Sequence, residues 1–237
     1  MSQISTRDEP LLKSVTNVAK QVRRRLGEAL GISNRQVPFT TSAEYWEQRY
    51  RVGGNSGAGS YGRLAEFKAE FLNRFVKDHA IGSVIEFGSG DGAQLALAEY
   101  PAYIGVDISP TAVEHCRSIY RDRSGFQFIH TSEYQPGTQA DLSLSLDVIY
   151  HLVEDEAFGA YMAQLFNSGL RFVIIYSSND DARPSSHVRH RRFTPWVESN
   201  APEFTLIAVE PNPFPFEPSD PQNTSPADFY VYAREGS

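Results

Sequence analysis

Cysteine is almost absent from this chain of 237 residues, which contains a single one, Cys116. One cysteine cannot form an internal disulfide, and it cannot supply a cysteine-rich zinc site. The chain also lacks any run of about 18 apolar residues, which is the length that a membrane-spanning helix needs. Residues 1–10 are polar and contain no apolar core of a signal peptide. We therefore expect a cytoplasmic protein with no membrane span.

An excess of positive charge is missing as well. The chain has 22 Lys and Arg residues against 29 Asp and Glu residues, a formal net charge of −7. Because binding to a phosphate backbone requires clustered cations, we do not expect nucleic acid as a partner. Two short basic clusters occur, at 23–25 and 189–192. Apolar residues at helical spacing surround the first, which we interpret as the solvated face of an amphipathic helix.

Residues 1–79 are predicted to form an N-terminal helical extension. Helical patterns cover 11–31, 43–50 and 64–79, and the segment 53–60 must be a loop because four of its eight residues are glycine. An amphipathic helix outside a core domain often covers a partner subunit, so the first of these helices favours a homodimer.

Residues 80–237 are predicted to form the main domain, in which short apolar runs alternate with helical patterns. The runs lie at 83–87, 103–106, 126–129, 142–146, 172–176, 205–209 and 229–232. The helical patterns lie at 92–100, 110–121, 154–167 and 194–200. This alternation predicts an α/β fold, a seven-stranded and mostly parallel Rossmann-like sheet with helices on both faces. The last two runs lack a helix between them, which indicates an antiparallel pair at one edge.

A glycine-rich turn follows the first predicted strand. Its pattern is Glu86-x-Gly88-x-Gly90-x-Gly92, and a helical pattern begins immediately after it. Glycine is required where a chain turns sharply and where its backbone touches a ligand, and a helix N-terminus offers free N–H groups. Asp107 ends the second predicted strand, where a carboxylate can accept hydrogen bonds from both hydroxyls of a ribose.

The alternating glycines, with an acid two residues before the first, resemble motif I of class I S-adenosylmethionine-dependent methyltransferases. Residues 104–109 and 141–152 resemble the same family, and the likeness extends over about 80–235. It implies a methyltransferase whose glycine loop holds the methionine portion of S-adenosylmethionine and whose Asp107 holds the ribose. Further cofactor-binding residues that it implies are Ile108, Leu146, Ser132 and Glu133, with Ser132 where many members carry an acid that binds adenine. The alternative is a similar fold that binds another nucleotide.

Residues 44–50 resemble the tryptophan-bearing helix that covers the cofactor in thiopurine-type methyltransferases. This resemblance implies that Trp46 and Tyr50 contact the cofactor and that the glycine loop, through Ser60 and Arg63, forms a lid. The extension 1–79 would then be both helical cover and cofactor lid. The alternative is that Trp46 belongs to the hydrophobic core.

Two arrangements could activate a hydroxyl acceptor, which is weakly acidic and needs a base or a metal ion. In the first, His151 is the base, beside Asp147 and within reach of His187. In the second, Asp147 and Asp180 bind Mg²⁺ through carboxylate oxygens. Both sets follow the fourth and fifth predicted strands, where open α/β sheets bind their ligands.

The second basic cluster suggests an acceptor. Residues 187–194 lie at the rim of the expected pocket, where Arg189 and Arg192 could bind an anionic or sugar-containing molecule. The whole arrangement resembles bacterial methyltransferases of saccharides and glycans, which implies O-methylation of a saccharide. The alternatives are another small-molecule acceptor, such as a phenol or natural product, and a catalytically silent cofactor-binding scaffold.

Overall fold

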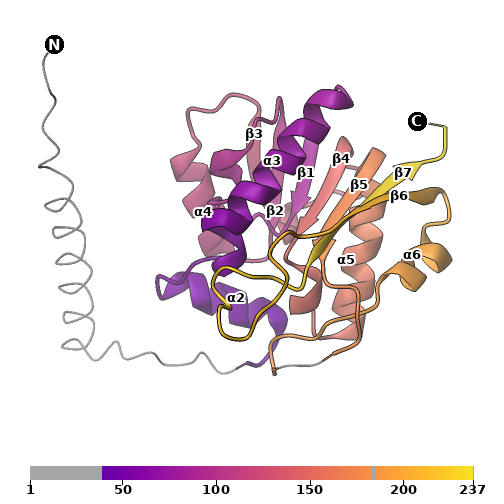
Figure 1. Cartoon of the computed structure of the whole chain (residues 1–237). Helices are drawn as coiled ribbons and strands as arrows, with labels where there is room; N and C mark the ends of the chain where they lie inside the picture. The colour runs from indigo at the N-terminus through magenta and orange to yellow at the C-terminus, as the bar shows by residue number, and fades with distance from the viewer. Residues whose placement is uncertain (1–38, 183–184, 237) are drawn as a thin grey trace, which may run out of the picture. The chain divides into compact units, whose positions relative to one another are not determined.

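The computed structural model describes residues 39–182 and 185–236 (Figure 1). The predicted helix 11–31, and with it the basis for the predicted homodimer, lies outside the described residues. The division into an extension 1–79 and a domain 80–237 therefore stays a prediction. No helix in the described part of the chain is long and apolar enough to cross a membrane.

The main element is a seven-stranded sheet in the order β3-β2-β1-β4-β5-β7-β6. The strands are β1 (Val84–Phe87), β2 (Tyr103–Asp107), β3 (Phe126–His130), β4 (Ala140–Leu146), β5 (Gly169–Ser177), β6 (Phe204–Glu210) and β7 (Asp228–Arg234). The first five are parallel, and β7 pairs antiparallel with both β5 and β6. The predicted α/β Rossmann-like fold, with its antiparallel pair at one edge, is confirmed.

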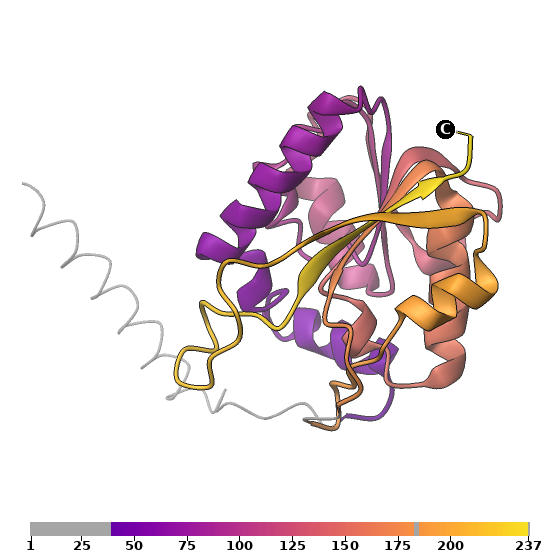
Figure 2. The ribbon, with the colours of Figure 1, turned by 45° about the vertical axis from the view of Figure 1, so that its right-hand side comes forward.

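Helices cover both faces of this sheet, as Figure 2 shows with the sheet nearly edge-on. They are α3 (Gly62–Asp78), α4 (Pro110–Ile119), α5 (Asp155–Ser168) and α6 (Thr194–Asn200), whereas α2 (Ser42–Arg51) lies at the carboxyl ends of the parallel strands (Figure 1). Strand side chains alternate between faces. Val84 therefore packs in one core cluster with α3 and α4, and Ile85 packs in a second cluster with α5 and α6.

The helix predicted at 92–100 is wrong. Only a 3-10 turn, Leu95–Leu97, forms there. The side chain of Asn73 on α3 donates to the carbonyl of Leu97 and accepts from the N–H of Glu99, at 2.9 Å each. These bonds occupy backbone groups that a continuing helix would use, so the segment leaves the helical path and extends toward β2.

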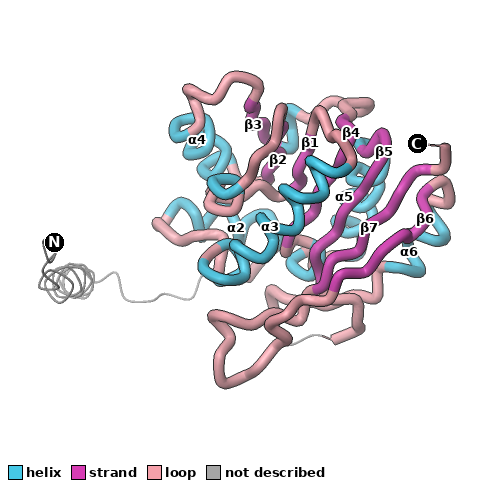
Figure 3. The backbone as a smooth tube through the Cα atoms, turned by 45° about the horizontal axis from the view of Figure 1, so that its top comes forward, coloured by secondary structure: helices cyan, strands magenta, loops and turns pink. Residues whose placement is uncertain are grey.

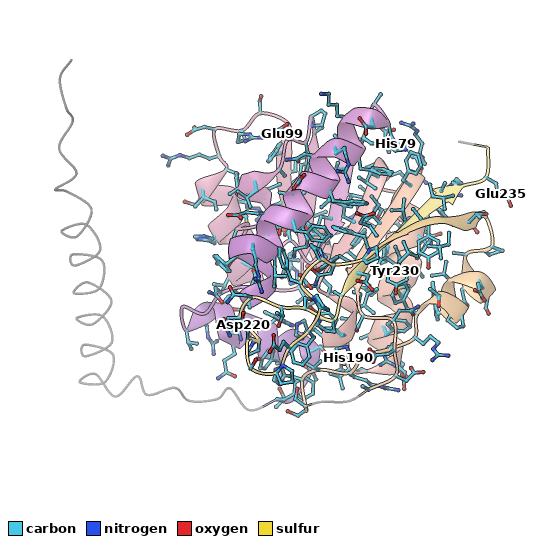
Figure 4. The ribbon with its side chains drawn as sticks, in the orientation of Figure 1. His79, Glu99, His190, Asp220, Tyr230 and Glu235 are labelled. Atoms are coloured by element: carbon cyan, nitrogen blue, oxygen red, sulfur yellow. The ribbon has the colours of Figure 1, made fainter. Side chains whose placement is uncertain are left out.

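Long loops gather where the parallel strands end (Figure 3). Residues 211–226, between β6 and β7, lie at this end because Asp228 pairs with Ser177 at the end of β5. Asp220 on this loop and His190 after β5 mark it in Figure 4, whereas His79 and Glu99 mark the opposite end. This arrangement brings segments from the whole domain together around the ends of β1, β2 and β4.

Candidate cofactor and acceptor site

A cavity of about 600 Å³ lies at the carboxyl ends of β1, β2 and β4. Its volume is that of a typical small-molecule site, and the carboxyl ends of parallel strands are where open α/β sheets bind ligands. The structure brings most of the predicted site residues to its wall: Trp46, Tyr50, Ser60, Glu86, Gly88, Gly90, Asp107, Ile108, Leu146, Asp147 and His151.

The glycine loop has a backbone that only glycine adopts easily. Gly88, Gly90 and Gly92 have φ values of 84°, 57° and 75°. A Cβ atom at Gly88 would lie 2.4 Å from Val148, and one at Gly90 would lie 2.3 Å from Ser56 Oγ. Gly92 has a different role, because it packs against Tyr120 and does not line the cavity.

The two predicted acids at the strand ends are buried and hydrogen-bonded. Glu86 accepts a hydrogen bond of 2.6 Å from the hydroxyl of Tyr103, yet burial raises the pKa of Glu86 to about 7. Asp107 accepts from the N–H groups of Gly90 and Ser109, at 2.8 Å each, one on each carboxylate oxygen. Burial raises the pKa of Asp107 as well. Each of its oxygens keeps a lone pair for a ribose hydroxyl.

The glycine-rich segment 53–60 is fastened to the glycine loop through Asp91, which the sequence analysis missed. Ser56 donates to Asp91 through its N–H and its hydroxyl, at 2.9 and 2.8 Å, and Tyr61 donates through its hydroxyl at 2.7 Å. Burial opposes ionisation of Asp91, but these hydrogen bonds outweigh it and lower its pKa. The segment therefore closes one side of the cavity.

Trp46 on α2 lies in the cavity wall and in neither core cluster. Its ring meets that of His151 edge-on, with centroids 4.8 Å apart, and tilts toward Tyr50 at 5.7 Å. The amino end of α2 is held by Glu154, which accepts from the N–H and hydroxyl of Ser42. The tryptophan is thus available to a bound ligand.

His151 belongs to the 3-10 turn Ile149–His151, just beyond β4. Its Nδ1 lies 3.3 Å from the backbone oxygen of His187. A carbonyl can only accept, so Nδ1 carries the hydrogen and Nε2 of the neutral ring keeps its lone pair. Burial lowers the pKa of His151 to about 4. The ring is therefore neutral at physiological pH.

The side chain of His187, predicted to come within reach of His151, is not among the residues of the cavity wall. Its ring stacks on Tyr45 at 4.8 Å, and burial lowers its pKa. Its contribution to the site is the backbone carbonyl that orients His151.

Lys68 is a second residue that the sequence analysis missed. It lies on the apolar face of α3, between Leu64 and Leu72, and is only 1% exposed. Its Nζ forms an ion pair of 2.5 Å with Asp147 Oδ2. A lysine four residues from an apolar neighbour on each side was the available signal, because a cation rarely interrupts a buried stripe without a partner.

The predicted magnesium ligands do not come together. The carboxylate of Asp147 is paired with the cation of Lys68, which disfavours a second cation such as Mg²⁺, and it accepts from the hydroxyl of Tyr150 at 2.7 Å. Asp180 is exposed and is not in the cavity wall. Across residues 39–182 and 185–236, no group of three His, Cys, Asp or Glu side chains could hold a metal ion. The structure therefore gives the magnesium alternative no support.

Three of the residues predicted to bind the cofactor lie away from the cavity, namely Arg63, Ser132 and Glu133. Arg63 binds the loop 211–226, through the carbonyl of Asn223 and the carboxylate of Asp220. Ser132 is exposed and bonds to His130, and Glu133 pairs with Arg117. Thr131 takes their place in the wall, because the 3-10 turn that follows β3 directs the next side chains to solvent.

The basic segment after β5, residues 187–194, has a structural role. Arg191 donates to the carbonyls of Leu152 and Val153 and pairs with Asp155 at 2.5 Å. Arg189 pairs with Asp155 as well, at 3.0 Å. These contacts fix the turn that carries His151, so the cluster helps to build the site from behind.

S-adenosylmethionine fits the groups that line the cavity. The buried hydroxyl of Ser89 lies in the wall and has no hydrogen-bond partner among the described residues. Gly88 and Gly90 line the cavity without side chains, and Asp107 offers acceptors at the place where a ribose is expected. Carboxylates outnumber cations in the wall, which suits a sulfonium.

Comparison with known proteins agrees with this geometry. Residues 85–174 match a family model described as a methyltransferase domain. The N-methyltransferase NodS from Bradyrhizobium japonicum WM9, in complex with S-adenosyl-l-homocysteine, superposes with a TM-score of 0.60 and 14% identity, over 83% of this chain and 100% of that one. Magnesium protoporphyrin IX methyltransferase from Synechocystis PCC 6803, with the same bound molecule, gives 0.59 and 14%, over 81% and 98%. No curated protein matches the sequence.

The matched domain, together with the confirmed fold, supports a methyltransferase enzyme. Residues 85–174 of this chain carry the methyltransferase domain, and they include the glycine loop, Asp107 and His151. The two structural relatives act on different molecules, so the shared fold leaves the acceptor open.

Proposed function

We propose that this protein transfers a methyl group to a hydroxyl of a saccharide or glycan in the cytoplasm, with His151 as the general base. The observation that carries the proposal is the neutral His151 ring, which lines the cavity with Nε2 unprotonated. The described residues provide no hydrogen-bond partner for this nitrogen. A base with a free lone pair beside the cofactor loop is what a weakly acidic hydroxyl requires.

Beyond a general base, methyl transfer requires little further catalysis by the protein. S-adenosylmethionine supplies a methyl carbon bonded to positively charged sulfur, so a good leaving group is already present. His151 Nε2 accepts the proton of the acceptor hydroxyl as the carbon–oxygen bond forms and the carbon–sulfur bond breaks. The carbonyl of His187 holds the imidazole orientation and stabilises the imidazolium through Nδ1. The proton then passes to solvent.

The outer part of the cavity suits a molecule with many hydroxyl groups. Glu156 and Gln164 lie in its wall, and neither side chain has a hydrogen-bond partner among the described residues. Trp46 presents an aromatic surface against which the apolar face of a sugar ring can lie. These features support a saccharide over a flat phenol or another natural product, which has fewer groups to satisfy the polar side chains.

The first experiment tests the cofactor. S-adenosylhomocysteine is titrated by calorimetry into the wild-type protein, into Asp107→Ala and into the exposed control Asp122→Ala. Two carboxylate hydrogen bonds to ribose predict a loss of affinity of roughly 10- to 100-fold in Asp107→Ala only. Absence of binding to the wild type would contradict the cofactor assignment, whereas binding without methyl transfer to any acceptor would favour the silent cofactor-binding scaffold.

The second experiment tests acceptor and base. Transfer of a labelled methyl group is measured with panels of saccharides, phenols and amines, each with Mg²⁺ and with chelator. We expect transfer to saccharides that is indifferent to chelator and falls about 10²- to 10⁴-fold in His151→Gln. Transfer to phenols or amines alone would overturn the saccharide acceptor, and unchanged rates in His151→Gln would overturn the base.

A further inference from the structure

Lys68 is the one Lys or Arg side chain that lines the cavity in the described part of the chain. An ammonium group has three N–H donors. The structure supplies a hydrogen bond for one of them, at Asp147 Oδ2, and the ring of Tyr176 lies 5.2 Å from Nζ. Because a buried cation with unsatisfied donors is unfavourable, a ligand that provides acceptors here would be stabilised.

The charges around Lys68 restrict which ligand group can reach it. The cavity wall also carries the carboxylates Glu86, Asp107 and Asp147. Carboxylates in the wall disfavour a nearby anionic group, whereas Lys68 favours one. A ligand carboxylate in this cavity therefore has one favourable position.

The position of the Lys68–Asp147 ion pair relative to the strand ends matches one end of the cofactor. Asp107 ends β2 and Asp147 follows β4, and these strands flank β1 on its two sides. Two interstrand spacings separate them, roughly 10 Å. A nucleoside with its ribose at Asp107 therefore extends over the glycine loop after β1 and brings an amino-acid end to Lys68.

We propose that Lys68 binds the α-carboxylate of S-adenosylmethionine and that the Lys68–Asp147 ion pair makes the site specific for cofactors with an amino-acid end. The proposal rests on the proposed function for the identity of the cofactor. Asp147 receives one hydrogen bond on each oxygen, from Tyr150 and Lys68, so each oxygen keeps a lone pair for the α-ammonium group. The ion pair of the protein thus faces the zwitterion of the ligand.

The glycine-rich segment closes over this ion pair. A Cβ atom at Gly59 would lie 2.5 Å from Asp147 Oδ2, so the backbone there approaches as closely as a glycine allows. The Lys68 side chain is 1% exposed and that of Asp147 is 14% exposed, so little water screens the two charges and their interaction with a bound zwitterion is strengthened.

The test compares two ligands that differ at the amino-acid end. Dissociation constants for S-adenosylhomocysteine and for 5′-methylthioadenosine, which lacks that end, are measured on the wild type, Lys68→Met and the exposed control Lys77→Met on the same helix. We expect Lys68→Met to lose roughly 10- to 100-fold in affinity for S-adenosylhomocysteine and little for 5′-methylthioadenosine. The ratio of the two constants should stay at the wild-type value in Lys77→Met.

A second variant guards against misfolding, because Lys68→Met leaves Asp147 without its cation. The double variant Lys68→Met/Asp147→Asn leaves no unpaired charge and should show the same collapse of the ratio with a normal melting transition. An unchanged ratio in whichever variant folds would overturn the role of Lys68, since a purely structural residue weakens both ligands alike. A wild type that binds neither ligand would instead refute the proposed function.

Discussion

Ser56 and Asp91 lie 35 residues apart and are joined by three hydrogen bonds. The N–H and hydroxyl of Ser56 bind the two carboxylate oxygens of Asp91, and the N–H of Asp91 donates back to Ser56 Oγ at 3.0 Å. Asp91 belongs to the glycine loop, and Ser56 belongs to the glycine-rich segment that covers it. Both residues line the cavity, so these bonds hold the glycine-rich segment against the glycine loop at the cavity wall.

Removal of the hydrogen bonds to Asp91 should therefore make the glycine-rich segment 53–60 more mobile. In Asp91→Ala we expect faster hydrogen exchange of residues 53–61 and dissociation of S-adenosylhomocysteine faster by roughly tenfold or more, because charge-assisted hydrogen bonds each contribute about 1.5–3 kcal/mol. Hydrogen exchange by mass spectrometry and stopped-flow release measure the two effects. Tyr61→Phe, which removes one of the bonds, should show a smaller change. Equal exchange in Asp91→Ala and wild type would contradict the role of Asp91.

The pH dependence of activity should show a general base whose pKa is unusually low. Burial lowers the pKa of His151 to about 4, so Nε2 stays unprotonated well below neutrality. We expect kcat/KM to remain level from neutral pH down to about pH 5, whereas a base with the ordinary histidine pKa of about 6.5 would lose most of its activity there. Binding of S-adenosylhomocysteine over the same range controls for folding. A fall centred between pH 6 and 7 would show that His151 is not the base.

Glu86 should make the protein less stable as the pH rises. Its pKa is about 7 in the folded protein against an ordinary 4.5, since burial disfavours the charged form. Between these two values the folded state holds more protons than the unfolded state, so stability falls with rising pH, by at most about 3 kcal/mol. Denaturant unfolding of wild type and Glu86→Gln at pH 5 and pH 8 measures the difference.

The comparison with Glu86→Gln is needed because His151 acts in the opposite direction over a similar range. Its pKa is lowered in the folded state, so its contribution to stability is lost as the pH falls from about 6.5 toward 4. Subtraction of the variant removes this contribution. Parallel stability curves for the two proteins would mean that Glu86 is ionised at an ordinary pH.

Substitution of two neighbouring arginines of the basic segment should change the free energy of unfolding by very different amounts. Arg191 is buried and binds two carbonyls and Asp155, whereas the side chain of Arg192 is exposed. We expect Arg191→Met to lower the free energy of unfolding by roughly 2–4 kcal/mol, because it leaves buried carbonyls without donors. Arg192→Met should stay within about 0.5 kcal/mol. Thermal and denaturant unfolding measure the two changes in stability. Equal effects of the two substitutions would contradict the structural role of Arg191.

Much of the fold follows from local pattern. Apolar runs such as 172–176 predict buried strands, and the spacing on α3 predicts an amphipathic helix, because each depends on periodicity within a few turns of chain. Among the described residues, the predicted helix that is missing is 92–100, where the side chain of Asn73, more than twenty residues upstream, binds the backbone.

The glycine loop and the acid after β2 could be located from the sequence for the same reason. The positive φ of Gly88 and Gly90 and the placement of Asp107 at a strand end are properties of adjacent residues. Predictions that needed the exact direction of a side chain after a strand were less successful. Ser132 and Glu133 follow β3 as expected, but the turn there directs them to solvent and Thr131 to the cavity.

The sequence by itself therefore determined the parallel sheet, the glycine loop and the acid at Asp107, because hydrophobic periodicity and glycine requirements are local. Only the tertiary structure decided that Lys68 meets Asp147, 79 residues away, and that the carbonyl of His187 orients His151. Such contacts join separate loops across the ends of the strands, and hydrogen bonds and ion pairs form only within a few ångströms. Distances of that kind arise when the helices pack on the sheet, and no spacing along the chain encodes them.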